Sequence, residues 1–297
     1  MRSILVFFFA IASFLQGDEI ASDPSLRSQR FLPASTAGKI TDMRLQEVSG
    51  MVASRTHPGL LWAINDSGNS PSLFLIDGQG KIIREYVVEG MVNFDWEDIA
   101  IYTDTTSGTT SLFIADIGDN LAIRDFINVI ELPEPQDLKD TLIRRFINHR
   151  FRFEDGARDA ESLIVDPMTR VMYIISKREK NVRIYQAPSN TPSSDTLLLT
   201  YKQSLPYHNI NAADITQNGR EILIKNYDAI YYWKKNKGES LLDALARAPE
   251  RLIYTPEPQG ESIAWTIDNM GFYTLSERNQ PKDQFLYYYH RNKEIEQ

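Results

Sequence analysis

Short apolar runs alternate with polar turn sequences along most of the chain. The best-defined segment is Asp95-Trp96-Glu97-Asp98-Ile99-Ala100-Ile101-Tyr102, and related segments occur at 47–52, 159–164, 211–216 and 259–264. A second apolar run follows each copy and ends in a polar loop, as 61–64 does before 65–68. Apolar runs of four to eight residues between turn residues are typical of β-strands. The pattern therefore predicts an internal repeat of β units.

The first four units each contain four predicted strands. These are 49–53, 60–64, 72–77 and 81–88; 97–102, 111–115, 128–132 and 146–153; 161–166, 171–176, 182–186 and 197–203; and 214–216, 221–225, 230–233 and 251–255. In the fourth unit, Ser240 and Asp243 form a capping-box pattern that predicts one short helix. The second unit carries a proline-rich insertion at 133–140.

The fifth unit has only three predicted strands, at 261–266, 272–276 and 285–289. An additional strand at 39–47 stands before the first unit and could complete it. Repeats of about 40 to 50 residues with four strands each are typical of β-propellers. We therefore expect an all-β fold over residues 39–297, a five-bladed β-propeller of four-stranded antiparallel blades closed by its N-terminal strand.

The N-terminal region differs in character from the repeats. An apolar run at 4–15 follows Arg2, and its length fits a signal peptide better than a membrane span. We expect residues 1–21 to be a signal peptide and 22–38 a flexible lead-in, and an uncleaved anchor is the alternative. The protein is then secreted or periplasmic, with no other membrane association. The chain contains no cysteine, so disulfides cannot stabilise it.

Composition limits the classes of partner. The chain has 42% hydrophobic and 24% charged residues and a net charge of −8. A nucleic-acid partner is not expected, because phosphate binding needs a dense basic surface. The four histidines are scattered, without the spacing of zinc ligands. A small or phosphate-containing ligand remains possible, and the sequence leaves the oligomeric state open.

The repeat also aligns a set of polar residues. Two positions before the apolar residues Met51, Ile99, Leu163, Ile215 and Ile263 stand Ser49, Glu97, Glu161, Ala213 and Glu261. In a propeller these positions would meet in the central channel. Two carboxylates ~4 Å apart at an effective dielectric of ~20 repel by about 4 kcal/mol, so a cation or a proton must compensate. An all-oxygen set favours Ca²⁺, and we expect Ser49, Glu97, Glu161 and Glu261 to bind it.

The loops after the second strands supply further candidates. They contain Asn65, Asp66, Asp116, Asp119, Asn120, Lys177, Arg178, Lys225 and Arg278. In a propeller these loops lie at the same mouth of the channel, where Asp98 and Asp214 are also expected. The alternative for each of them is an ordinary polar turn residue.

The order Ser49, Glu97, Glu161, Ala213, Glu261 resembles the ring of the calcium-activated nucleotidase (apyrase) family of five-bladed propellers. That family carries serine or glutamate at all five positions around a central Ca²⁺, and Ala213 departs from its pattern. The resemblance implies that Asn65, Asp66, Lys177, Arg178 and Lys225 face nucleotide phosphates. The segments at 95–100, 115–120, 155–163 and 259–264 are similar to a widespread group of secreted bacterial propellers.

Two functions follow from this reading. In a Ca²⁺-dependent hydrolase of phosphate esters or anhydrides, Asp66, Asp116 or Asp119 would activate water. The basic residues Lys177, Arg178, Lys225 and Arg278, with Asn65 and Asn120, would then bind the substrate. In a non-catalytic ligand- or protein-binding propeller the ion would be structural. The sequence lacks a Gly-x-Ser-x-Gly nucleophile motif and does not decide between these functions.

Overall fold

The computed structural model describes residues 27–188, 195–278 and 283–295, and these residues form an all-β fold. The segment expected to be a signal peptide, 1–21, lies outside them. Among the described residues, the helical elements are the short helix α2 (Leu241–Leu245) and a 3-10 turn (Met43–Leu45). Ser240 caps α2 by accepting from the Asp243 amide, as the capping-box pattern predicts. No helix in the described ranges is long and apolar enough to cross a membrane.

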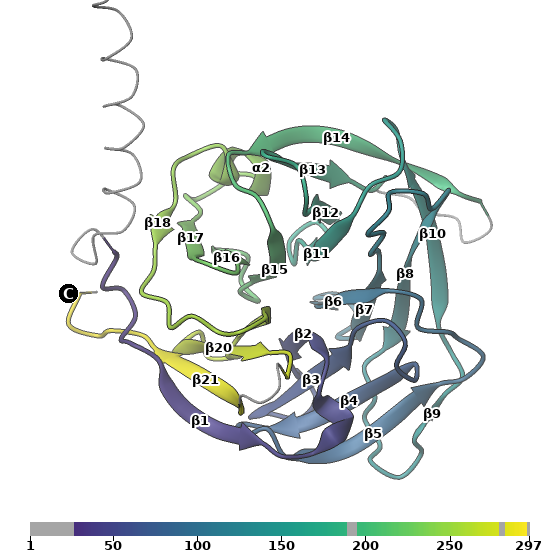
Figure 1. Ribbon diagram of the computed structural model, residues 1–297, viewed down its shortest axis with the longest axis horizontal. Helices are drawn as coiled ribbons and strands as arrows, with labels where there is room; N and C mark the ends of the chain where they lie inside the picture. The colour runs from purple at the N-terminus through teal and green to yellow at the C-terminus, as the bar shows by residue number, and fades with distance from the viewer. Residues whose placement is uncertain (1–26, 189–194, 279–282, 296–297) are drawn as a thin grey trace, which may run out of the picture.

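Two sheets each contain four antiparallel strands. One runs in the order β15 (Ile210–Ile215), β16 (Glu221–Asn226), β17 (Ile230–Lys234) and β18 (Glu250–Arg251). The other runs β1 (Ser35–Ile40), β21 (Gln284–His290), β20 (Gly271–Ser276) and β19 (Gly260–Trp265). The N-terminal strand therefore pairs with the C-terminal strand, and purple β1 lies beside yellow β21 in Figure 1.

The closing strand begins earlier than its apolar pattern predicts. It starts at Ser35 rather than Lys39, and the chain then turns at 43–45, where the Asp42 carboxylate accepts from the Arg44 amide (3.0 Å). This capping interaction stops the strand before Leu45, which is fully buried. Before β1, Phe31 is also buried and packs against Trp265 and Phe272.

The two remaining sheets are larger. One contains β2 (Val48–Ala53), β3 (Leu60–Asn65), β4 (Ser72–Asp77), β5 (Ile82–Val88) and the short β9 (Leu142–Ile143), which follows the proline-rich insertion and pairs parallel with β5. The other has eight strands, in the order β11 (Ala160–Val165), β12 (Met172–Ser176), β13 (Val182–Gln186), β14 (Leu197–Leu205), β10 (Ile147–Phe153), β8 (Ile127–Pro133), β7 (Thr110–Asp116) and β6 (Trp96–Thr103). Parallel pairing of β10 with β14 joins two antiparallel four-strand groups within it.

The first strand of each group packs against its neighbours around a common centre. The contacts run from β2 to β6, β11, β15 and β19 and return to β2, so they close a ring (Figure 1). Hydrophobic clusters fill the spaces between adjacent sheets, and Trp62, Trp96, Trp233 and Trp265 are fully buried in them. The strands approach closely at the centre, where a Cβ on Gly50 would lie 2.9 Å from the Asp98 Cα. Burial of these faces is what holds the ring together.

Candidate functional site

All five central strands contain the same irregularity near their start. The pairing jumps by one residue in each, as between Trp96 with Asp116 and Asp98 with Ala115, and leaves one residue outside the ladder. The five residues are Ser49, Glu97, Glu161, Asn211 and Glu261. A bulge of this kind changes the direction of a side chain relative to the regular strand. The five side chains therefore occupy equivalent positions around the centre.

At the fourth position of the ring, the structure corrects the alignment made from sequence. Ala212 pairs with Lys225 and Ala213 with Ile224, so Ala213 is the equivalent of Leu163 and lies in the regular strand. Asn211 takes the position that was assigned to Ala213. The alignment failed because it matched Ile215 to the apolar residue of the other units and could not detect the bulge. The ring therefore has an oxygen-bearing side chain at all five positions.

Carboxylates converge next to Glu97. Its oxygen belongs to two groups, one with Asp66 and Asp95 and the other with Asp159 and Glu161, and the ligand atoms within each group lie within 4.8 Å of one another. Sequence reasoning did not select Asp95 or Asp159. Each stands two residues before a ring glutamate, and that spacing places two side chains on one side of an extended chain. The repeated Asp-x-Glu spacing was the available signal.

A buried amide brings Asp66 to this group. The Asn93 side chain donates to the carbonyls of Asn65 (2.9 Å) and Asp66 (2.8 Å) and accepts from the Trp96 amide (3.0 Å). It thereby ties the end of β3 to the start of β6. On the other side Gly118 packs against the cluster, because a Cβ there would collide with the carboxylates of Glu97 and Asp95. A larger residue there would displace both carboxylates.

The cluster is partly neutralised by its own cations. Lys177 forms an ion pair with Glu161 and lies 3.7 Å from Glu261, to which Tyr227 also donates. Arg178 forms an ion pair with Asp159 and donates to Asn120. In the described part of the chain, Asp66, Asp95 and Glu97 take part in no such pair. The second oxygen of Glu161 is buried and also lacks a hydrogen-bond partner there.

Burial and mutual repulsion disfavour the charged forms of these acids. Burial, followed by the charge of Glu161, raises the pKa of Glu97 well above its ordinary value, and the pKa of Glu161 is also raised well above it. Burial and the neighbouring Asp66 raise the pKa of Asp95 to about 6. Burial also disfavours the charge of Lys177, but Glu161 and Glu261 outweigh it and raise the Lys177 pKa. The cluster favours an additional positive charge.

Ser49, the first ring residue, is fully buried. Its hydroxyl donates to the carbonyl of Trp96 (2.7 Å), the residue before the next ring position. The Asn211 amide donates in the same way to the carbonyl of Gly260, which precedes Glu261 (3.0 Å). Each of these two residues therefore links its strand to the next strand around the centre. The side-chain oxygens of Ser49 and Asn211 still have lone pairs that can accept a hydrogen bond.

Other predicted residues bind groups in their own loops. Asp116 is buried and forms an ion pair with Arg124 (2.9 Å), and the Asp119 carboxylate accepts from the amides of Ile123 (3.0 Å) and Arg124 (2.8 Å). These contacts fold the loop after β7. They direct Asp116 and Asp119 toward their own loop, whereas Asp66 lies in the cluster.

Three predicted binding residues also have partners outside the cluster. Lys225 is fully buried and donates to the Gly260 carbonyl, and burial lowers its pKa to about 8. The Asn65 side-chain amide donates to the Arg44 carbonyl (2.6 Å). The Arg278 amide donates to the Gln46 carbonyl (2.6 Å), and its guanidinium contacts Met43.

Asp98 and Asp214 were expected at the channel mouth, but they bind backbone groups of adjacent strands. The Asp98 carboxylate accepts from the amides of Ile99 (2.8 Å) and Leu163 (2.9 Å), and that of Asp214 accepts from Ile215 and Trp265 (both 2.7 Å). Each carboxylate thus joins its own strand to another central strand. Burial raises the pKa of both groups, that of Asp214 to about 7, and these amide bonds oppose the effect.

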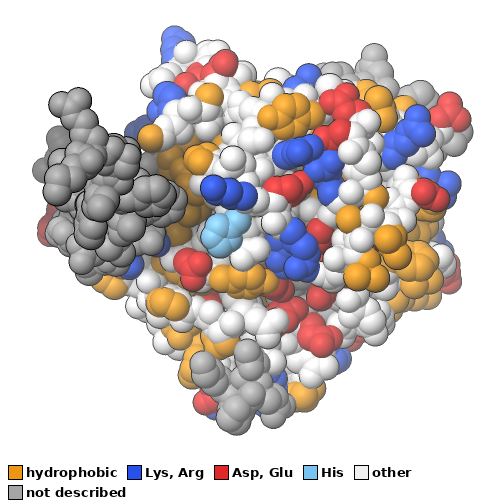
Figure 2. Space-filling view, turned by 45° about the horizontal axis from the view of Figure 1, so that its top comes forward, with side chains coloured by type: hydrophobic (Ala, Val, Ile, Leu, Met, Phe, Trp, Pro, Cys, Tyr) orange, Lys and Arg blue, Asp and Glu red, His pale blue; other side chains and the backbone are white. Residues whose placement is uncertain are grey.

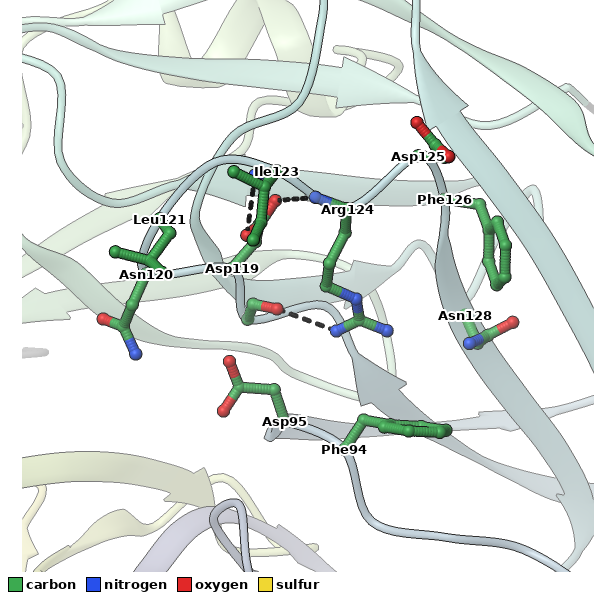
Figure 3. A pocket seen from close by; sticks show the side chains of 11 residues that line it. Phe94, Asp95, Asp119, Asn120, Leu121, Ile123, Arg124, Asp125, Phe126 and Asn128 are labelled. Atoms are coloured by element: carbon green, nitrogen blue, oxygen red, sulfur yellow. Dashed lines mark hydrogen bonds between the residues drawn. The ribbon is translucent and has the colours of Figure 1, made fainter.

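A pocket of about 480 Å³ adjoins the carboxylates (Figure 3). Its lining residues are Phe94, Asp95, Gly118, Asp119, Asn120, Leu121, Ile123, Arg124, Asp125, Phe126 and Asn128. The Arg124 side chain donates to the Gly118 carbonyl (2.7 Å), and Figure 3 shows the Asp119 carboxylate turned into its own loop. On the face seen in Figure 2, basic side chains are interspersed with acidic ones.

The fold and site define an all-β protein of mainly antiparallel sheets with an acidic centre. A search against protein-family models found no match for the chain, and a search of curated proteins found none either.

Proposed function

We propose that the chain is a secreted or periplasmic five-bladed β-propeller that binds Ca²⁺ at the centre of its ring. Five blades are supported by the five central strands in closed contact and by the division of the eight-stranded sheet into two four-strand groups. The pairing of β1 with β21 supports closure by the N-terminal strand. The single observation that carries the cation is the group Asp66, Asp95 and Glu97, whose carboxylates lie together and form no ion pair within the described residues.

The charges favour one position for the ion. Lys177 already forms ion pairs with Glu161 and Glu261, and Arg178 forms one with Asp159. The ion therefore binds to Asp66, Asp95 and Glu97, close to Glu161, one oxygen of which has no hydrogen-bond partner within the described residues. Oxygens bound to one Ca²⁺ at 2.3–2.6 Å can be separated by at most ~5 Å, which agrees with the separations of up to 4.8 Å in this group. Glu161 lies next to the ion through its group with Glu97, whereas Ser49 and Glu261 belong to the surrounding ring.

An all-oxygen site is suited to a hard cation. Carboxylates with irregular spacing favour Ca²⁺, because Mg²⁺ requires a smaller and more regular shell. Extracellular sites commonly hold Ca²⁺ with dissociation constants of about 10⁻⁴ to 10⁻³ M, which suits a secreted protein.

Calcium titration of the full chain by calorimetry tests this proposal. We expect one ion per chain, with affinity at least tenfold lower in Glu97→Gln because one negative charge is removed. Glu89→Gln is the matched control, since Glu89 is exposed and forms only a 3.4 Å surface pair with Arg144. If the wild type binds no divalent ion, the carboxylates are stabilised by protons instead and the proposal is wrong.

Hydrolysis of a phosphate ester or anhydride is the second candidate. It is favoured by the acidic group itself, because an ion bound by Asp66, Asp95 and Glu97 would polarise a phosphate oxygen and lower the pKa of a bound water. Phosphate would then contact the ion more than Lys177, Arg178 or Lys225, whose charged groups already have partners. Phosphate release from a panel of nucleotides and esters should require Ca²⁺. If none is released, the non-catalytic binding protein remains.

The closed ring has its own test. A chain that begins at Asp42 lacks β1 and Phe31, exposes the edge of β21 and opens the core around Trp265. We expect its melting temperature to fall by more than 10 °C. Melting as high as that of the full chain would contradict closure by the N-terminal strand.

A further inference from the structure

The pocket beside the carboxylates is unusually apolar for an exposed position. Phe94, Leu121 and Ile123 are 66%, 77% and 71% exposed, and Phe126, 39% exposed, also lines the pocket. Exposed apolar side chains that gather around one cavity mark a ligand or partner site more often than isolated ones do. In Figure 3, Phe94 and Phe126 lie on one side of the pocket and Leu121 and Ile123 on the other.

The loop that carries Leu121 and Ile123 is preformed. Asp119 binds two amides within it, and its own amide donates to the Asp159 carboxylate (2.9 Å). The Arg124 side chain, which is the cation of the pocket, bonds to the Gly118 carbonyl and pairs with Asp116. Its charge is therefore largely compensated. The apolar walls are held in place, and the pocket provides little positive charge of its own.

The pocket and the carboxylate cluster share a wall. Asp95 lines the cavity and also belongs to the group with Asp66 and Glu97, and Gly118 lines the cavity while its Cα packs against those carboxylates. A molecule in the pocket therefore ends beside the proposed ion. The ion supplies the positive charge that Arg124 does not.

We propose that this pocket binds the apolar part of an amphipathic organic anion whose oxygens coordinate the ion bound by Asp66, Asp95 and Glu97. The proposal rests on the proposed function, and it specifies the ligand class: an aromatic or branched aliphatic group joined to a phosphate, phosphonate or carboxylate. Phe94, Leu121 and Ile123 determine the preference for the apolar group. The ion determines the preference for the anion.

Phenylphosphonate and methylphosphonate are suitable probes, because they share a headgroup and differ in apolar surface. In calorimetric titrations of the full chain at saturating Ca²⁺, phenylphosphonate should bind about tenfold or more tightly than methylphosphonate. The double variant Phe94→Ser, Leu121→Ser should lose most of this difference. Met168→Ser, which removes a 69% exposed apolar side chain outside this pocket, should keep it. Ca²⁺ affinity, titrated separately, should be the same in all of them.

Equal affinity for the two phosphonates would overturn the inference, as would equal loss in Met168→Ser. Tighter binding of benzylamine than of phenylphosphonate at saturating Ca²⁺ would also overturn it, because the site would then select cations. The calcium titration separates the two proposals. Without Ca²⁺ binding the proposed function and this inference both fail, whereas Ca²⁺ binding without a phenyl preference contradicts this inference alone.

Discussion

Two groups of buried carboxylates lie on the central strands and are stabilised in different ways. Asp98 and Asp214 each accept two backbone amide bonds, one from their own strand and one from another. Glu97 and Glu161 face other carboxylates, and Glu161 has an oxygen without a partner in the described ranges. Backbone donors oppose the rise in pKa in the first group, whereas neighbouring charges increase it in the second. The first group is satisfied by backbone amides, and the second is where we propose that a cation binds.

We propose that this difference separates structural acids from cation-binding ones. A carboxylate whose oxygens are satisfied by amides holds strands together, and its removal leaves buried donors unpaired. A carboxylate that repels its neighbours destabilises the fold until a cation binds. The two groups therefore make opposite predictions for substitution.

The largest effect is expected for Asp98→Ala. The change leaves the amides of Ile99 and Leu163 without acceptors in the core, at a cost of about 2–5 kcal/mol of unfolding free energy. Urea unfolding followed by tryptophan fluorescence measures it. Asp98→Asn, which keeps one acceptor, should cost less. A loss below about 1 kcal/mol for Asp98→Ala would mean that the amide bonds do not distinguish the two groups.

The effect of Glu97→Gln on the unfolding free energy should instead have opposite signs without and with Ca²⁺. In chelator it should raise the unfolding free energy by about 1 kcal/mol, because it removes a repelling charge. At 100 times the dissociation constant, Ca²⁺ should stabilise the wild type by about 2.7 kcal/mol and the variant by less. Thermal melts with chelator and with Ca²⁺ show both effects. The same sign in both conditions would contradict a repulsive cluster.

The pH dependence provides a third comparison. Burial raises the pKa of Asp214 to about 7 in the folded state, above its ordinary value of 3.8. The folded state therefore binds the proton more tightly than the unfolded state, and stability is lost as the pH rises through about 7. At saturating Ca²⁺, the melting temperature of the wild type should fall from pH 5 to pH 8, and that of Asp214→Asn should fall less. Equal slopes would show that other groups cause the dependence.

The smallest effect is expected at Ser49. Its hydroxyl donates to the Trp96 carbonyl, so Ser49→Ala should cost about 1 kcal/mol of unfolding free energy. Calcium affinity should change less than threefold, because the proposed ligands are the carboxylates of Asp66, Asp95 and Glu97. A large loss of affinity, measured by calorimetry, would restore Ser49 as a direct ligand.

Most strands and their antiparallel order within each group could be predicted from sequence, because burial on both faces produces apolar runs that end in turns. The parallel pairings of β9 with β5 and of β10 with β14 were not predicted. The same repeat located Glu97, Glu161 and Glu261 at equivalent positions. It misplaced the fourth position because a bulge shifts the register by one residue without altering hydrophobicity, so Ala213 was chosen instead of Asn211.

The partners of the charged residues could not be predicted. Lys177 and Glu161 are 16 residues apart and meet only when β11 pairs with β12. In sequence, Asp116 and Asp119 are candidate bases. In the folded chain, Asp116 forms an ion pair with Arg124, and the Asp119 carboxylate accepts from the Arg124 amide. The pairing of charged residues depends on the directions of side chains across neighbouring strands, and these directions cannot be deduced from a single sequence.

The parallel pairing of β10 with β14 has a consequence for local opening. Phe151, Arg152 and Phe153 lie opposite Leu197, Leu198 and Leu199, so the outer edges of two four-strand groups share one ladder. Their edge amides are covered, whereas an ordinary outer strand exposes one side to water. Hydrogen exchange should therefore be slow on both sides of this junction. The two groups should also open together as one subglobal unit, while the sheet that ends in β18 frays by itself.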